Sequence, residues 1–248
     1  MPDFKPPSSP KRVVTDASSD ALGELLALVA HDLRNPLAAL SSNVGFLNMV
    51  TEGLSPDARE TLVDLGLSVE AMGRVIASLD VLCGELKGKE AHAPQLCSAA
   101  LLVRGVWPEV ERAAQSHGVL LSLDLDSLEE EKFSAAEPAL KCALSFLLHN
   151  ALTVAKTGTT VSLSLCQTDT ELIFVVEDDG PALSPELVES AFSAVGQLQI
   201  KSEPRGRYSR GLGLYAVARS ATLAHARLQV GETSRGSSLQ LAVKKQGA

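Results

Sequence analysis

Apolar side chains recur every three or four residues along the first part of the chain, from Leu26 to Leu47. This spacing predicts a long amphipathic helix over residues 20–50. Ser55 and Pro56 are typical of a helix start, and the same spacing then continues to Leu86, which predicts a second helix. Because only a short turn separates the two helices, we expect them to form a hairpin.

The predicted hairpin cannot bury all of its apolar surface within itself. Each Leu or Ile that stays exposed forgoes about 1.5–3 kcal/mol of burial. Pairing with a second copy of the chain as a four-helix bundle removes this cost, so we expect a homodimer. The alternative is that the hairpin caps the second domain of its own chain.

The pattern divides the chain into four parts. Residues 1–19 are expected to be a disordered tail, 20–88 the helical hairpin, 89–95 a polar linker and 96–248 a second domain. In the second domain we expect helices over residues 98–116, 137–155 and 185–192, and from residue 211. Strands are expected over residues 119–125, 160–166, 171–177, 227–230 and 238–243. Helices on one face of a mixed sheet suit this order, so the fold class is α+β.

The composition of the chain argues against two classes of function, nucleic-acid binding and membrane insertion. The chain has 248 residues, 45% of them hydrophobic, and a formal net charge of −8. The negative charge argues against nucleic-acid binding, which needs a basic surface. No run of about 18 apolar residues could span a bilayer, so we expect a cytoplasmic chain without membrane insertion. Any membrane sensor would then be absent or supplied by a separate protein. The four cysteines are widely scattered and are expected to be reduced and mostly buried.

His31 lies off the apolar stripe of the first predicted helix. Successive helical residues are about 100° apart, so the ring is expected to face solvent while Leu33 faces a partner. A solvated imidazole is a usable nucleophile near neutral pH. Asp32 could accept its proton or orient the ring, and Asn35 lies one turn further on the same face. Taken alone, a histidine at such a position is more often a plain exposed residue.

Four short motifs in the second domain combine polar residues and glycines. Each has an ordinary explanation when taken singly: a structural asparagine, an Asp-Gly turn, a glycine-rich helix start or a strand-entry turn. In chain order, they are Asn150 within an apolar helix, Glu177-Asp178-Asp179-Gly180 at a strand end, Gly211-Leu212-Gly213-Leu214 before a helix, and Gly236-Ser237-Ser238 before the last strand.

The order of these motifs is far more specific than any one of them. The run His31-Asp32-Leu33-Arg34-Asn35-Pro36-Leu37 closely resembles the phosphoacceptor box of the sensor histidine kinases of two-component signalling. The four later motifs resemble the N, G1 and G2 boxes and the terminal glycine turn of the histidine kinase ATP-binding domain. The resemblance covers about residues 20–243. It implies a dimeric four-helix bundle followed by an α/β two-layer sandwich of the GHKL ATPase type.

The resemblance also implies a role for each matching residue. His31 would be phosphorylated from ATP with Mg²⁺, assisted by Asp32, and the phosphoryl group would pass to an aspartate of a response regulator receiver domain. Asn35 matches a position that orients water for dephosphorylating the regulator. In the nucleotide site, Asn150 would coordinate Mg²⁺, Asp178 would accept the adenine amino group, and Gly180 would allow the turn beneath the base. The phosphate loop and terminal turn would be formed by Gly211, Leu212, Gly213, Leu214 and Ser237.

The chain departs from the family pattern around the nucleotide. Phe146 stands where the N box usually has an additional asparagine, and Thr153 stands where it usually has a basic residue. We hypothesise that a basic segment compensates by contacting the phosphates, and the alternative is a mobile, solvated charge run. This segment contains Lys201, Arg205, Arg207 and Arg210.

Two other functions compete with the kinase. In the first, the chain is a histidine phosphotransferase in which His31 relays phosphate between response regulators and the second domain binds no nucleotide. In the second, the hairpin is a dimerising adaptor without chemistry. The retained Asn150, Asp178 and Gly-Leu-Gly-Leu motif favour the kinase over the relay, and the spacing of His31, Asp32 and Asn35 argues against the adaptor.

Overall fold

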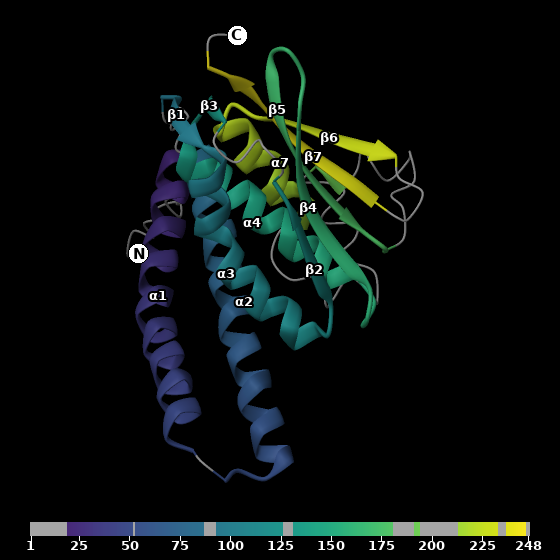
Figure 1. The fold of residues 1–248 in the computed structure, drawn as a ribbon. Coiled ribbons are helices and arrows are strands. Elements are labelled where there is room, and N and C mark those ends of the chain that lie inside the picture. The colour runs from purple at the N-terminus through teal and green to yellow at the C-terminus, as the bar shows by residue number, and fades with distance from the viewer. Residues whose placement is uncertain are drawn as a thin grey trace, which may run out of the picture.

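Two long helices, α1 (Ser19–Val50) and α2 (Pro56–Leu86), run side by side as a hairpin along one flank of the molecule (Figure 1). The computed structural model describes residues 19–51, 53–86, 93–125, 131–180, 191–193, 213–232 and 237–246. The second helix begins as the sequence predicts, because the Ser55 hydroxyl accepts a hydrogen bond from the Ala58 backbone at 3.3 Å and Pro56 takes the first helical position.

The hairpin buries only part of its apolar surface within one chain. Val44 of α1 and Val69 and Ile76 of α2 are buried between the helices and their neighbours. Leu40 and Leu47, which belong to the predicted apolar stripe, keep 41% and 40% of their surface exposed. The hairpin therefore presents a row of large apolar side chains to solvent. This row consists of Leu33, Leu40, Phe46, Leu47, Met49, Val50, Val63, Leu65, Met72 and Val75.

The second domain is built on a mixed seven-stranded sheet. Its main path runs in the order β1 (Gln95–Ser98), β3 (Lys132–Ala135), β7 (Ser237–Lys245), β5 (Glu171–Asp178), β4 (Thr160–Gln167) and β2 (Leu120–Asp124). Among the strand pairs that the structure describes, β2–β4 alone is parallel. The remaining strand is β6 (Arg227–Glu232). It pairs antiparallel with β7, on the same side of β7 as β3.

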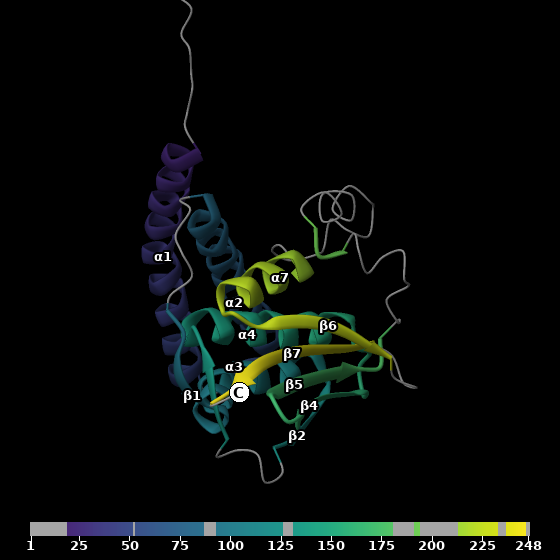
Figure 2. The same cartoon turned by 90° about the horizontal axis from the view of Figure 1, so that it is seen from above.

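In the described part of the chain, three helices cover one face of this sheet and none covers the other (Figure 2). They are α3 (Ala99–His117), α4 (Glu137–Val154) and α7 (Gly213–Leu223). Burial alternates strictly along β5, so every second side chain of this strand is buried against the helices. Phe174 of β5 meets Phe133 of β3 edge to face at 5.7 Å between ring centroids, which ties the middle of the sheet to its side.

The structure confirms most of the predicted elements of the second domain and adds two. Helices α3 and α4 and strands β2, β4, β5, β6 and β7 lie within a few residues of the predicted ranges. Strands β1 and β3 were not predicted, because each has only four residues and no long alternating pattern. Pro108 lies inside helix α3 and does not end it. The predicted tail, most of the linker and most of the helix over 185–192 lie outside the described residues.

Candidate functional site

His31 lies on α1 with its ring in solvent. Its side chain is 69% exposed, as the sequence predicts for a residue off the apolar stripe. The carboxylate of Asp32 lies against the ring, with Oδ1 3.4 Å from Nδ1. Asn35 is also exposed and follows one helical turn later, on the same face. The structure therefore brings the three predicted residues of the hairpin together on one accessible surface.

An ion pair joins the two helices of the hairpin beside this surface. The guanidinium of Arg34 on α1 binds the carboxylate of Asp80 on α2. Both side chains are about half exposed, at 47% and 44%, so solvent screens the attraction between them. The pair thus sets the local register of α1 against α2 more than it stabilises the hairpin.

Asp178 is the last residue of β5 and lies on the face that the helices cover. The alternation along β5 buries Leu172, Phe174, Val176 and Asp178 in turn. The carboxyl group is thus held at the end of an apolar row, with only 5% of the residue exposed. Burial raises the pKa of Asp178 above its usual value; the backbone hydrogen bond from Gly180 opposes this shift, and the charge of Asp179 adds to it.

Gly180 forms a tight turn around the Asp178 carboxylate. Its N–H donates to Oδ1 of Asp178 at 2.7 Å. A β-carbon at position 180 would lie 2.6 Å from that oxygen and 3.0 Å from Cγ2 of Val154 on α4, so only glycine fits here. Val154 follows Asn150 by one turn, and residues four apart share a helix face. The half-buried Asn150 therefore lies on the side of α4 that meets this turn.

Strand β7 and helix α7 place three more predicted residues around the same end of the sheet. Ser237 pairs in register with Asp178 across the β5–β7 ladder. Gly213 opens α7 with a φ of 50°, a conformation that favours glycine, and Leu214 is buried behind it. The remaining predicted phosphate-loop and basic-segment residues lie outside the described residues. These are Lys201, Arg205, Arg207, Arg210, Gly211 and Leu212.

The metal-binding potential of the described residues rests on amide and carboxylate oxygens. Within the described ranges there is no cluster of three or more His, Cys, Asp or Glu side chains that could hold an ion. Asn150 remains the candidate ligand, because an amide oxygen is a hard donor of the type that suits Mg²⁺. The four cysteines are reduced thiols: Cys83 and Cys97 are buried, Cys142 is half-buried and Cys166 is exposed, so the prediction of mostly buried thiols holds for the first two.

Sequence reasoning missed a polar pair formed by the residue next to Asn150. The neighbouring His149 is 7% exposed, and its Nε2 lies 3.2 Å from Oε1 of Glu109 on α3. The hydrogen bond from His149 lowers the pKa of Glu109 despite the burial of the carboxyl group. The signal was present in the sequence, since His149 is a second polar residue inside an apolar helix and a buried polar side chain needs a partner.

Two protein-family models match the chain, one for each part of the fold. The model described as "His Kinase A (phospho-acceptor) domain" matches residues 21–82. The model described as "Histidine kinase-, DNA gyrase B-, and HSP90-like ATPase" matches residues 135–247. The first match contains His31, Asp32 and Asn35, and the second contains Asn150, Asp178 and Gly180.

Curated relatives match the chain over most of its length. The sensor histidine kinase RppB of Synechocystis sp. is 27% identical over 202 residues, which cover 82% of this chain and 44% of RppB. The sensor protein SrrB of Staphylococcus aureus is 21% identical over 196 residues, which cover 77% of this chain and 32% of SrrB. The chain thus spans less than half the length of either relative. In the described part of this chain, none of the helices has the length and apolar character that a membrane crossing requires.

Solved structures share the fold across both parts of the chain. The histidine kinase AdeS of Acinetobacter baumannii aligns with a TM-score of 0.54 at 17% identity, covering 88% of this chain and 98% of AdeS. Full-length ShkA in complex with AMPPNP aligns with a TM-score of 0.56 at 22% identity, covering 90% of this chain and 45% of ShkA. A helical hairpin followed by a sheet covered on one face is therefore a shared architecture.

Proposed function

Because the chain belongs to the sensor histidine kinases of two-component signalling, we propose that it transfers the γ-phosphoryl group of ATP to His31. The observation that carries this proposal is the exposed His31 ring, with a carboxylate on one of its nitrogens. The ring stands on a helical hairpin that is joined to an ATPase-type fold. An acceptor for a tethered nucleotide must be accessible in this way, and a structural histidine need not be.

The contact with Asp32 favours one ring nitrogen as the nucleophile. A carboxylate accepts from Nδ1–H, so the free lone pair of the neutral ring lies on Nε2. In the proposed reaction, Nε2 forms a bond to the γ-phosphorus while the bond from that phosphorus to the β,γ-bridging oxygen breaks. ADP leaves, and Asp32 takes up the Nδ1 proton of the phosphorylated ring. Asp32 therefore serves both to orient the ring and to remove its proton.

We place the nucleotide at the end of the sheet where β5, α4 and α7 meet. Asp178 would accept the adenine amino group with the oxygen that Gly180 leaves available. The turn at Gly180 has no room for a side chain at that position. Without a side chain there, the adenine base could approach the backbone of the turn closely. Asn150 would hold Mg²⁺, which neutralises phosphate charge when bound. Gly213 with Gly211, Leu212, Leu214 and Ser237 would line the phosphates, and Lys201 and Arg210 would supply positive charge.

We further propose that the active form is a homodimer. Among the described side chains of α1 and α2, ten large apolar ones are exposed in the single chain, including Leu40, Leu47 and Met49. A four-helix bundle formed with a second hairpin would remove this surface from water. The dimer would keep His31 accessible, because its ring does not belong to the apolar row.

The phosphoryl group would then pass from His31 to an aspartate of a response regulator receiver domain. Asn35 is exposed one turn after His31, where it could position water against the phosphorylated regulator. We propose this residue for dephosphorylation of the regulator. The activity is tested separately by Asn35→Ala, which should leave labelling of His31 intact while slowing the loss of phosphate from a phosphorylated receiver domain.

Labelling experiments separate the kinase from the relay. The chain is incubated with γ-labelled ATP and Mg²⁺, and in parallel with a receiver domain phosphorylated by acetyl phosphate. A kinase becomes labelled by ATP with an acid-labile, alkali-stable group that is lost in His31→Gln. A histidine phosphotransferase is labelled only by the phosphorylated receiver domain, and that result would overturn the kinase proposal.

A further inference from the structure

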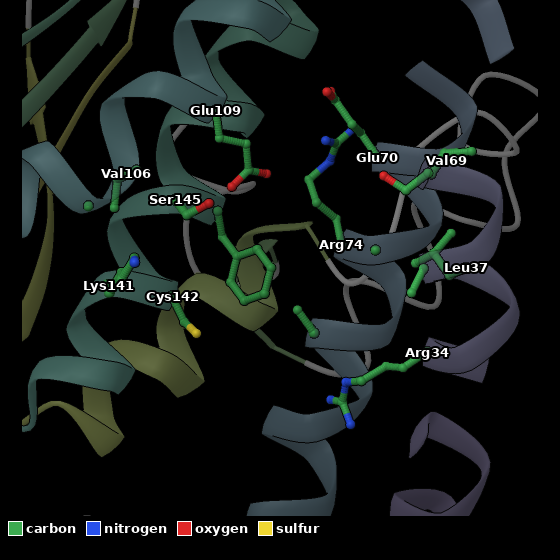
Figure 3. Close-up of a pocket in the computed structure, with 16 residues that line it drawn as sticks. Arg34, Leu37, Val69, Glu70, Arg74, Val106, Glu109, Lys141, Cys142 and Ser145 are labelled. Atoms are coloured by element: carbon green, nitrogen blue, oxygen red, sulfur yellow. The ribbon is translucent and has the colours of Figure 1, made fainter. Parts of the chain in front are cut away.

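The hairpin and the second domain meet across a cavity of about 600 Å³ whose walls come from α1, α2, α3 and α4. Figure 3 shows Glu109 on one wall and Glu70 and Arg74 on the opposite wall. The walls therefore carry charged groups of both signs: Glu70 and Arg74 belong to the hairpin, and Glu109 belongs to the second domain. These three residues have no role in the site at His31 or in the nucleotide site as proposed above.

Opposite charges face each other across this boundary in a crossed pattern. On α2, Glu70 and Arg74 are one turn apart, and on α3, Glu109 and Arg112 are also one turn apart. The guanidinium Nε of Arg112 lies 4.0 Å from Oε1 of Glu70. Arg74 lies on the wall opposite Glu109 (Figure 3), and the hydrogen bond from His149, together with the positive charges of Arg74 and Arg112, lowers the pKa of Glu109. Charged groups of opposite sign thus face each other between α2 and α3.

Glu109 also belongs to a second contact, inside the ATPase domain. Its Oε1 accepts the hydrogen bond from Nε2 of His149 at 3.2 Å. The carboxylate therefore contacts the α4 imidazole, while Arg74 of the hairpin lies across the cavity from it (Figure 3). His149 is almost fully buried, so its ring cannot exchange this partner for water without moving α4.

The position of His149 in α4 gives this contact its importance. The next residue is Asn150, and adjacent helical side chains are fixed about 100° apart. Holding the His149 ring against α3 therefore sets the rotation of this turn of α4 and the direction of Asn150. The same turn is fixed by Thr153, whose hydroxyl donates to the His149 carbonyl at 2.8 Å.

We propose that Glu109 and His149 are positioning residues that couple docking of the hairpin helix α2 to the nucleotide site. When Arg74 faces Glu109, the carboxylate is held where it fixes His149, and Asn150 is presented to the nucleotide. When the ATPase domain leaves this docked position, Glu109 loses Arg74 and its hold on His149 weakens. The inference rests on the proposed function, because Asn150 has its role only in a nucleotide-binding chain.

The test is a double-mutant cycle on the full chain, with affinity for AMPPNP measured by calorimetry in the presence of Mg²⁺. Arg74→Ala is expected to weaken binding about three- to tenfold in the wild-type background. In a Glu109→Ala background, the same change should have little further effect, because the carboxylate that faces Arg74 and accepts from His149 has been removed. Arg59→Ala, an exposed arginine on α2 away from the cavity, is the matched control and should bind as the wild type does.

The conservative variant separates positioning from packing. His149→Gln places an amide N–H close to where Nε2 lies, so it should retain most of the affinity. His149→Leu keeps an apolar body but lacks the donor, so it should lose about as much affinity as Glu109→Ala. Equal losses in the Gln and Leu variants would overturn the positioning role, since packing alone would then account for both.

A second readout does not depend on nucleotide. Amide hydrogen exchange over residues 146–154 is compared between the wild type, Arg74→Ala and Arg59→Ala. Faster exchange in Arg74→Ala alone supports the coupling, and unchanged exchange overturns it. If the wild-type chain binds no nucleotide at all, the proposed function fails, whereas the exchange data still decide whether Arg74 holds the end of α4.

Discussion

Replacing Asp178 by Asn should change which purine the chain prefers. In the folded chain, Oδ1 of Asp178 accepts the Gly180 N–H at 2.7 Å. The asparagine can keep this bond only by placing its oxygen there, which turns its NH₂ group toward the proposed base. That group would repel the 6-amino group of adenine. It would instead donate to the 6-carbonyl group of the inosine base.

The size of the effect follows from the hydrogen bond that is lost. A hydrogen bond to a charged partner is worth about 1.5–3 kcal/mol, which is roughly a 10- to 150-fold change in affinity. We therefore expect Asp178→Asn to weaken ATP binding by a factor in this range and to bind ITP more tightly than ATP. The wild type should show the opposite order. Isothermal titration with both nucleotides measures the two ratios.

The pH dependence of the folding stability of Asp178→Asn is the control for the binding experiment. Because burial raises the pKa of Asp178 in the folded state, this group favours folding below its unfolded pKa, near 3.8. That contribution is lost as the pH rises through the higher folded-state pKa. Asparagine does not titrate, so the variant should gain stability relative to the wild type as the pH increases to neutrality. Urea unfolding at several pH values tests this.

Two results would refute the reasoning about Asp178. In the first, Asp178→Asn binds ATP as tightly as the wild type, which would mean that the carboxylate does not contact the base. In the second, the variant loses ATP and ITP equally while remaining folded. A general loss of this kind would indicate a damaged pocket instead of a changed hydrogen-bond pattern.

Three further predictions concern other parts of the molecule. Gly180→Ala should lower the free energy of unfolding by about 1–3 kcal/mol through overpacking and should abolish ATP binding; urea unfolding at wild-type stability would contradict this. The wild type should sediment as a dimer and Leu40→Glu as a monomer, whereas the exposed Leu101→Glu on α3 should stay dimeric; a dimeric Leu40→Glu would count against the bundle. Asp80→Asn removes a half-exposed ion pair and should cost no more than about 1 kcal/mol in denaturant unfolding, so a much larger loss would show that the pair is structurally essential.

The sequence was sufficient for the elements whose patterns are long. The hairpin, the α4 helix and the adjacent β4 and β5 strands each extend over enough residues for their periodicity to be clear. Period-two alternation also placed Asp178 on a definite side of β5, once the helices were known to cover that side. The solvent-facing position of His31 followed from the same kind of argument on α1.

Contacts between distant segments could not be read from local patterns. Strands β1 and β3 are short and are defined by their partners in the sheet. The hydrogen bond between Glu109 and His149 joins residues 40 positions apart, so neither residue predicts the other. The closeness of Val154 to Gly180 likewise depends on how α4 ends against β5. Such features require the packed tertiary structure.

The most direct test of the central claim is to locate the phosphoryl group on a single atom. The chain, labelled with ¹⁵N at histidine, is incubated with ATP and Mg²⁺ and studied by NMR under alkaline conditions. The account predicts a phosphorus–nitrogen coupling to Nε2 of His31, which is absent in His31→Gln. Phosphate on Nδ1 of His31, on another histidine or on none of them would contradict it.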